Sequence, residues 1–200
     1  MSLPPSSPDV PRVTIRDETL LSDNWGRLTR YQIDYRRSDG RIERQTREVY
    51  DRGEGAVILL YDRDGGTVVL TRQFRLPAFV AGEDPELIEA CAGLLDAQDP
   101  ETAIRREAEE ETGYRVGTVE RLWTAFMTPG SVTERLHFFI APYEAGMKIS
   151  GGGGEEAEGE DIEVLEMRLA EALEMVRTGE ICDAKTIMLL QHVALAGIMS

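Results

Sequence analysis

Two short apolar segments constrain the fold of this chain more than any other feature. They are AVILLY at residues 56–61 and TVVLTR at residues 67–72, separated by the turn residues Asp64, Gly65 and Gly66. Segments of this length, rich in β-branched residues and bounded by a turn, are typical of strands. Because nearly all of their side chains are apolar, we expect a layer of structure on both faces of this hairpin.

Other segments carry weaker strand and turn patterns. Residues 27–36 alternate between polar and apolar, and pairing is predicted to resume over residues 42–50 after a turn at 38–40. This hairpin is predicted to form a small N-terminal layer of its own. The remaining strand candidates are residues 86–91, 119–124 and 136–142.

Three helices are predicted in the second half of the chain. The first begins after Asp99, which can cap it, has Pro100 in its first turn and ends at Gly113. Apolar residues three and four positions apart predict two more helices over residues 169–178 and 184–198. Residues 149–160, ISGGGGEEAEGE, are expected to form a mobile loop, with the glycine run as a hinge or linker.

The order of these elements predicts an α+β domain, with strands early, one helix in the middle and helices at the end. Two hundred residues suit one domain with a small appendage. We expect a disordered tail over residues 1–12, an N-terminal β layer over 13–52 and the main domain over 53–200.

Charge and composition exclude several classes of function. The net charge of −15 disfavours binding to nucleic acids, although a small anionic substrate can bind if a cation bridges the two. No apolar run is long enough to span a bilayer, and the N-terminal residues lack the pattern of a signal peptide. Cys91 and Cys182 have no metal or redox spacing, so we expect two buried thiols in a reducing cytoplasm.

The predicted helix over residues 100–112 contains EAEEE, four glutamates in five positions. Glu107, Glu110 and Glu111 fall within about one 100° arc, where like charges cost a few tenths of a kcal/mol per pair. The pairs Arg105–Glu109 and Arg106–Glu110 have the spacing to offset part of this cost. The ridge is either a solvated charged face, which is common on surface helices, or a hard-oxygen site for Mg²⁺ or Mn²⁺.

The order of residues around this ridge resembles the Nudix box. That motif is a Gly followed, after an interval, by Arg-Glu, an apolar residue, any residue, Glu-Glu, any residue, Gly and an apolar residue. One departure is Asp99, which replaces the usual Glu, and the interval before the Arg is one residue shorter. The matching positions are Gly93, Arg106, Glu107, Ala108, Glu109, Glu110, Glu111, Thr112, Gly113 and Tyr114.

The resemblance implies a Nudix hydrolase with an α/β/α sandwich and a mixed sheet. Such an enzyme cleaves a nucleoside diphosphate linked to another moiety by metal-assisted attack of water at phosphorus. Glu107, Glu111 and the carbonyl of Ala92 would bind the metal, and Glu160 would complete its shell from the acidic loop. Arg106 and Glu110 would orient these ligands. Glu134 and Glu160 are both candidates for the general base, and we favour Glu160.

Stretches outside the box resemble the GDP-mannose hydrolase (GDP-mannose pyrophosphatase) subfamily, which also shares the shortened interval. This resemblance implies a homodimer that hydrolyses GDP-mannose to GMP and mannose 1-phosphate. The stretches are LLSDNW (20–25), REVYDRG (47–53), RQFR (72–75), IEACAGLLD (88–96), TPGSVTE (128–134), EDIEVLE (160–166) and TGEICDAKT (178–186).

The subfamily's ligand contacts can be carried over to positions in this chain. Thr46, Arg47 and Glu48 would reach the ligand from the other subunit, through exchanged N-terminal layers. Without the resemblance, Trp25 is interpreted as a surface or inter-strand packing aromatic in preference to a stacking one, whereas Arg75 is an ion-pair partner as readily as a phosphate clamp. The implied contacts are Trp25 (guanine stacking), Arg75, Ala92, Gly93, Leu94, Glu111, Glu134, Glu160 and Lys185.

Two rival functions remain open at this stage. Pro129 stands fifteen residues past Tyr114, a spacing that resembles the ADP-ribose branch of the superfamily and implies an ADP-ribose or ADP-sugar pyrophosphatase. The other rival is a non-catalytic module that binds a nucleotide sugar. Such modules usually lose box carboxylates, and all of them are present here. His137 and His192 are expected to be structural.

Overall fold

The chain folds into two compact units. The structure is a computed structural model that describes residues 11–155, 157 and 159–199. One unit contains the chain up to Arg52 together with Thr128–Glu134, and the other contains Gly53–Met127 and Arg135–Ser200. Residues 1–10 of the predicted tail lie outside the described residues.

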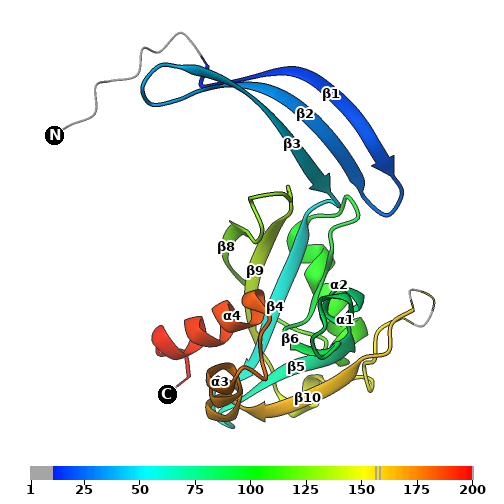
Figure 1. Ribbon diagram of the computed structural model, residues 1–200. Coiled ribbons are helices and arrows are strands. Elements are labelled where there is room, and N and C mark those ends of the chain that lie inside the picture. The colour runs from blue at the N-terminus through cyan, green and yellow to red at the C-terminus, as the bar shows by residue number, and fades with distance from the viewer. Residues whose placement is uncertain (1–10, 156, 158, 200) are drawn as a thin grey trace, which may run out of the picture. The chain divides into compact units, whose positions relative to one another are not determined.

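The N-terminal unit is an antiparallel sheet of three strands, in the order β1 (Val13–Asp23), β2 (Arg27–Arg36) and β3 (Ile42–Asp51) (Figure 1). The sequence pattern predicted only the hairpin β2–β3. The sequence of β1 does not alternate regularly between apolar and polar residues, because its register against β2 shifts twice, between Ile15 and Asp17 and between Leu20 and Ser22. Each shift moves the following side chains to the other face of the sheet.

The segment Thr128–Glu134 belongs to this same unit, although it was predicted to lie in the main domain. The amide of Tyr50 donates to the carbonyl of Ser131 at 2.8 Å, and the amide of Thr133 donates to the carbonyl of Tyr50 at 3.0 Å. Glu134 forms an ion pair with Arg52, with Nε and Oε1 3.5 Å apart. The segment is therefore an extension of the end of β3.

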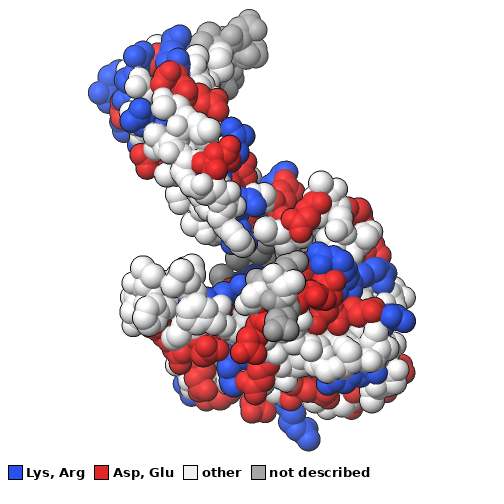
Figure 2. All heavy atoms as spheres, turned by 90° about the vertical axis from the view of Figure 1, so that its right-hand side faces the viewer, with Lys and Arg blue, Asp and Glu red and all other residues white. Residues whose placement is uncertain are grey.

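The excess of negative charge lies in the sequence after residue 52. Residues 1–52 contain ten arginines and nine acidic residues, which leaves 12 basic and 28 acidic residues for 53–200. On the face shown in Figure 2, Asp and Glu side chains are interspersed with Lys and Arg. A bound cation is therefore electrostatically favoured in the larger part of the chain.

The second unit is built on a mixed sheet. Its main path runs β10-β5-β4-β9-β8, with the short strand β6 on β5 and β7 on β4. β4 and β9 pair in parallel, and the other pairs are antiparallel. β10 was not predicted. The strands are β4 (Gly55–Asp62), β5 (Thr67–Phe74), β6 (Glu86–Glu89), β7 (Ala92–Leu94), β8 (Glu120–Phe126), β9 (Arg135–Pro142) and β10 (Glu163–Arg168).

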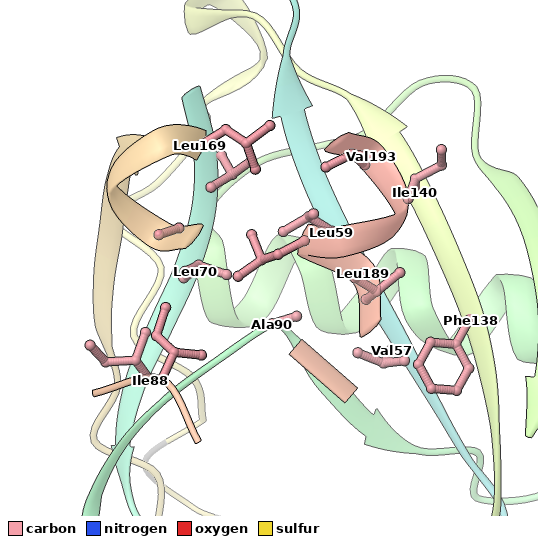
Figure 3. Close-up of a cluster of buried hydrophobic side chains, with 14 of the residues drawn as sticks. Val57, Leu59, Leu70, Ile88, Ala90, Phe138, Ile140, Leu169, Leu189 and Val193 are labelled. Carbon is pink, nitrogen blue, oxygen red and sulfur yellow. The ribbon is translucent and has the colours of Figure 1, made fainter. Parts of the chain in front are cut away.

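Helices cover both faces of this sheet, as the apolar hairpin predicted. Residues 56–60 of β4 are at most 1% exposed. On one face, α3 (Leu169–Thr178) and α4 (Ala184–Leu195) contribute Leu169, Leu189 and Val193 to a core that contains Leu59 and Leu70 (Figure 3). On the other face, α2 (Pro100–Thr112) buries apolar side chains of its own. The result is the α/β/α sandwich that the resemblance implied.

Two further short helices complete the second unit. They are α1 (Leu76–Ala81) and the 3₁₀ helix η1 (Ala145–Met147), and neither was predicted. α1 has no buried residue, so no apolar periodicity marks it in the sequence. Among the described residues, no helix is long and apolar enough to cross a membrane.

Helix α2 begins and ends where its capping residues predicted. The side chain of Asp99 accepts hydrogen bonds from the amides of Glu101 and Thr102, both at 3.2 Å. Gly113 adopts a left-handed φ of 78°, and its amide donates to the carbonyl of Glu109 at 3.0 Å. Both ends of this helix are therefore fixed by local sequence.

A tight turn accounts for the shortened interval between Gly93 and α2. The amide of Gln98 donates to the carbonyl of Leu95 at 2.7 Å. The two residues between them, Asp96 and Ala97, have φ values of 45° and 64°. A turn with two left-handed central residues resembles the mirror-image turns that usually require Asn or Gly. The shorter loop thus places a non-glycine residue, Ala97, in an unfavourable conformation.

Replacing Ala97 with Gly should stabilise the protein by roughly 0.5–1 kcal/mol. Relief of the left-handed penalty exceeds the added entropy of an unfolded glycine. The same change at Ala170, an exposed position in the first turn of α3, should instead lower stability, by up to about 1 kcal/mol, because it removes a good helix former. Denaturant unfolding of both variants measures the two effects. A loss of stability in Ala97→Gly would contradict the strain argument.

Candidate active site

The glutamate ridge of α2 is buried. Glu107 is 9% exposed and Glu111 is 1% exposed, so the interpretation as a solvated charged face is wrong for these two residues. They lie on the side of α2 that also buries Ile104 and Ala108. One oxygen of Glu111, Oε2, is buried with no hydrogen-bond partner among the described residues. A buried carboxylate oxygen without a donor is costly unless a proton or a cation compensates it.

Burial raises the pKa of Glu111 to about 8. The nearby carboxylates of Glu107 and Glu160 raise this pKa further, whereas a hydrogen bond from the thiol of Cys91 and the charge of Arg75 lower it. Both desolvation and like charges disfavour the ionised form. Near neutral pH the side chain therefore holds a proton unless a cation replaces it.

Gly93 lets the strand β7 approach Glu107 closely. A Cβ atom on Gly93 would overlap the carboxylate of Glu107, so a side chain at this point of the motif would force Glu107 away from its bond with Arg106. β7 is held in place by pairing with β4, in which Ala56 lies opposite Gly93. The close approach puts the backbone of residues 92–94 beside the buried glutamates. The unpartnered oxygen of Glu111, this cradle and the hard-oxygen chemistry all fit a divalent cation such as Mg²⁺ or Mn²⁺.

Arg106 links two glutamates of the helix. Its Nη2 donates to Glu107 Oε1 at 2.7 Å and its Nη1 donates to Glu110 Oε2 at 2.6 Å. The predicted pair Arg106–Glu110 is therefore present. The predicted pair Arg105–Glu109 is wrong: Arg105 bonds to Glu101 at 2.7 Å, and Glu109 pairs with Arg115 at 2.8 Å. An acid that precedes the base by four residues is the more favourable helical arrangement, and Glu101 supplies it.

Glu160 lies on the acidic loop, whose backbone is hydrogen-bonded to the last turn of α2. Its Oε2 accepts a hydrogen bond from the amide of Glu155 at 2.9 Å, and its charge acts on both Glu111 and Cys91. In the described part of the chain, no three His, Cys, Asp or Glu side chains are grouped so as to hold a metal ion by themselves. Glu107 and Glu160 are bonded instead to Arg106 and to the backbone. The predicted metal shell, including the carbonyl of Ala92, stays a prediction.

A buried carboxylate that no sequence pattern marked holds Arg75, the predicted phosphate clamp, and Lys185, a predicted ligand contact. Glu89 is 2% exposed and accepts from Arg75 Nε at 2.7 Å and from Arg75 Nη2 at 3.0 Å. Lys185 Nζ also bonds to Glu89, and it lies 3.0 Å from Asp183 Oδ1. Desolvation opposes the charge of Glu89, but the two cations outweigh it and lower the pKa of Glu89. A lone Glu in the buried stretch IEACAG was the only sign of this role in the sequence.

The remaining predicted contacts lie in the N-terminal unit. Trp25 is 84% exposed in the turn between β1 and β2. This turn packs on the end of β3, because a Cβ on Gly26 would lie 2.8 Å from the carbonyl oxygen of Asp51. Glu134 extends the same end of β3. Thr46, Arg47 and Glu48 are exposed further along that strand. The contact roles of these five residues stay predictions.

The two cysteines differ in environment, contrary to the expectation that both are buried. Cys91 is 1% exposed, and burial followed by the charges of Glu111, Glu107 and Glu160 raises the pKa of its thiol well above its ordinary value. Cys182 is exposed in the segment between α3 and α4, although its neighbour Ile181 is buried in the core.

Both histidines have structural contacts. The Nδ1 atom of His137 lies 2.9 Å from Thr124 Oγ1 and its Nε2 atom lies 2.9 Å from Glu54 Oε2. The ring of His192 packs edge-on against Trp123, with ring centres 4.8 Å apart. These contacts agree with the structural roles that were expected.

Comparisons with known proteins match nearly the whole chain. Residues 12–50 match a family model described as the GDP-mannose pyrophosphatase NudK N-terminal domain, and residues 51–190 match the NUDIX domain. A GDP-mannose pyrophosphatase of Pectobacterium atrosepticum is 56% identical over 186 residues, 92% of this chain and 95% of that protein. A GDP-mannose pyrophosphatase of Escherichia coli is 51% identical over 189 residues, 94% of this chain and 98% of that protein.

A solved structure shares the fold at low sequence identity. The crystal structure of an ADP compounds hydrolase superposes with a TM-score of 0.73 over 96% of this chain and 98% of that one, at 19% identity. The sandwich, the intact box on α2 and the two family matches agree with one another. The chain therefore belongs to the Nudix family.

Proposed function

We propose that this protein hydrolyses the pyrophosphate bond of GDP-mannose, giving GMP and mannose 1-phosphate, with Mg²⁺ as its cofactor and Mn²⁺ as an alternative. The observation that carries the proposal is the pair of buried glutamates, Glu107 and Glu111, in an intact Nudix box. The names of relatives at 51–56% identity support the choice of substrate.

The cation would be held by the carboxylates of Glu107, Glu111 and Glu160 and by the carbonyl of Ala92. When bound, a divalent ion neutralises the charge of the pyrophosphate and lowers the pKa of a coordinated water molecule. Arg106 and Glu110 orient Glu107 through the two hydrogen bonds that Arg106 donates. The backbone of Gly93 and Leu94 lines the substrate side of this site.

Arg75 and Lys185 are proposed to bind the phosphates. Both cations are held by Glu89, and Arg75 is close enough to Glu111 to affect its pKa. A guanidinium with its orientation fixed loses little entropy when it clamps a phosphate. Binding then depends on the arrangement of cations inside an acidic protein and not on its net charge.

Glu160 is proposed as the general base as well as a metal ligand, with Glu134 as the alternative. Glu160 is near Glu111, whereas Glu134 belongs to the N-terminal unit. The turnover of the variant Glu160→Gln tests the choice between Glu160 and Glu134 as the general base. Near-normal turnover at saturating Mg²⁺ would transfer the role of base to Glu134.

The N-terminal unit is proposed to complete the site of a second copy of the chain. Its thin sheet exposes large apolar residues, and a sheet of three strands needs a covered apolar face for stability. In a homodimer with exchanged N-terminal layers, Trp25 would stack on the guanine, while Thr46, Arg47 and Glu48 would reach the ligand of the other subunit. The exposed apolar residues of this sheet include Val13, Ile15, Leu20, Leu21 and Ile42.

We also place the enzyme in the cytoplasm, without nucleic-acid or membrane partners. Both cysteines are free thiols, which suits a reducing compartment. The acidic excess of residues 53–200 suits a small substrate bridged by a cation better than a polyanion.

An ADP-ribose or ADP-sugar pyrophosphatase is the second candidate, because of the spacing of Pro129 after the box. The ratio of kcat/KM for GDP-mannose to that for ADP-ribose in the presence of Mg²⁺ decides between the two. A screen of nucleotide sugars that follows release of the monophosphate extends the test. Tight binding of GDP-mannose with no metal-dependent release of GMP would indicate a non-catalytic module instead.

Glu107→Gln and Glu111→Gln should each abolish most turnover. The loss should exceed the roughly 10–100-fold that removal of an outer-shell partner costs, because a proposed metal ligand is lost. Glu109→Gln is the matched control: it makes the same chemical change in the same helix, at a residue paired with Arg115. Steady-state kinetics and thermal melting with and without Mg²⁺ measure the outcome. Mg²⁺ should raise the Tm of the wild type, and a variant that loses activity only by unfolding would contradict the assignment.

Metal-free Glu111→Gln should be more stable than the wild type at alkaline pH. The folded wild type keeps the proton of Glu111 up to about pH 8, whereas the unfolded chain releases it near 4.5, so the free energy of unfolding falls as the pH rises through that window. The glutamine removes this loss, which amounts to a few kcal/mol in order of magnitude.

Denaturant unfolding in EDTA from pH 4 to pH 9 measures the difference between the two proteins. Glu109→Gln is again the control, because Arg115 lowers the pKa of Glu109 and the variant should gain no stability as the pH rises. A difference between wild type and Glu111→Gln that does not change with pH would show that Glu111 titrates normally.

Two inactive variants should complement each other if the dimer exchanges its N-terminal layers. Arg47→Ala removes a contact proposed to act on the partner's ligand, and Glu111→Gln removes a metal ligand within the same chain. A mixed dimer contains one site with both residues intact, so co-expression should restore roughly a quarter of wild-type activity. Sedimentation establishes the dimer independently. A dimer without complementation would overturn the exchange.

A further inference from the structure

The glycine run after η1 is packed against the C-terminal end of α2, in place of the hinge or linker that its composition predicted. The amide of Gly153 donates to the carbonyl of Glu111 at 2.9 Å, and the amide of Gly154 donates to the carbonyl of Glu110 at 3.1 Å. These carbonyls lie in the last turn of α2, where the helix itself supplies no donors. The loop is thus bonded to the backbone of two residues of the Nudix box.

This packing requires residues without a side chain. Gly152, Gly153 and Gly154 have φ values of 70°, 117° and 77°, which non-glycine residues rarely adopt. A Cβ on Gly152 would overlap the carbonyl oxygen of Glu111 and lie 2.7 Å from the carbonyl carbon of Thr112. The backbone of the loop can therefore touch the helix only because these positions are glycine.

Gly154 also makes room for Glu160. A Cβ on Gly154 would overlap the carboxylate of Glu160 and lie 2.8 Å from its Cβ. Two residues after Glu160 in the sequence, the amide of Ile162 donates to the carbonyl of Gly153 at 3.2 Å, and Ile162 is 7% exposed. Glu160 is accordingly flanked by the buried residue Ile162 and by the backbone of Gly153 and Gly154, which is hydrogen-bonded to α2.

We propose that Gly152 and Gly154 are positioning residues, which dock the acidic loop on α2 and thereby fix the carboxylate of Glu160 beside Glu111. The inference rests on the proposed function, in which Glu160 is a metal ligand. It goes further, because it attributes the position of Glu160 to packing of the loop backbone against α2, the helix that carries Glu107 and Glu111.

The electrostatics of the site agree with this placement. The charge of Glu160 contributes to the raised pKa of Glu111 and to that of Cys91, in agreement with the docked position of the loop. A carboxylate on a loop without fixed contacts would spend most of its time in solvent, where its charge is screened. Docking keeps the third ligand close at a small entropic cost when the metal binds.

The test compares Gly154→Ala with two control variants and with Glu160→Gln. Gly179→Ala has the same left-handed strain, since the φ of Gly179 is 91°, but a Cβ there meets open space. Gly151→Ala changes the same loop at a position with open space and no left-handed φ. Mn²⁺ affinity, followed by the electron paramagnetic resonance of the free ion, is measured for each protein together with kcat and with Tm in EDTA.

Gly154→Ala should weaken Mn²⁺ binding by about the same factor as Glu160→Gln, roughly tenfold or more, and should lower kcat in parallel. Gly151→Ala and Gly179→Ala should keep the wild-type affinity, even if Gly179→Ala melts at a lower temperature. A folded Gly154→Ala protein with wild-type affinity for Mn²⁺ would overturn the inference. This readout separates a positioning role from a structural one, which would change Tm alone.

The proposed role of Glu160 and its proposed positioning by the glycines can be overturned by different results. Wild-type affinity and turnover in Glu160→Gln would overturn the proposed role of Glu160, and the inference with it. Impaired Glu160→Gln with unaffected Gly154→Ala would overturn the inference alone. If Gly154→Ala does not fold, amide hydrogen exchange of the wild type decides: the amides of Gly153 and Gly154 should be protected like that of Gly113, and exchange at the rate of an open loop would sink the proposal.

Discussion

The rest of the site depends on the burial of two like charges, Glu107 and Glu111, on one side of α2. Their mutual repulsion and desolvation must be offset, and the chain does so with Arg106, with the thiol of Cys91 and with a proton on Glu111. Access to the carboxylates then requires backbones that can come close to them. Gly93 provides that access to Glu107, and Gly154 makes the corresponding room for Glu160, whose carboxylate a Cβ at position 154 would overlap.

Much of the second unit could be predicted because its signals are local. The apolar hairpin 56–72 specified burial on both faces, and the caps Asp99 and Gly113 specified the length of α2. The motif on that helix specified the family. Each of these signals occupies about twenty consecutive residues or fewer, a range over which periodicity and capping control structure.

The features that were missed depend on contacts between distant parts of the chain. Strand β1 is broken by two register shifts, and β10 pairs with β5 between residues that are 91 to 101 positions apart. Glu89 acquires its role only where the fold brings Arg75 and Lys185 together. The glycine run was predicted to be a linker because its composition shows only that side chains are absent. The backbone of α2, against which a side chain would clash, comes next to these glycines only in the folded chain.

The unequal environments of the two cysteines have a practical consequence. Reaction with an alkylating or oxidising reagent requires a thiolate that solvent can reach, and Cys91 offers neither, since it is buried and burial raises the pKa of its thiol. Cys182 is exposed and stands one residue before Asp183 and three residues before Lys185, which form an ion pair at the start of α4. The natural sequence thus provides one selective attachment point for a fluorophore or spin label, about one helical turn from a proposed phosphate contact, without removal of any cysteine.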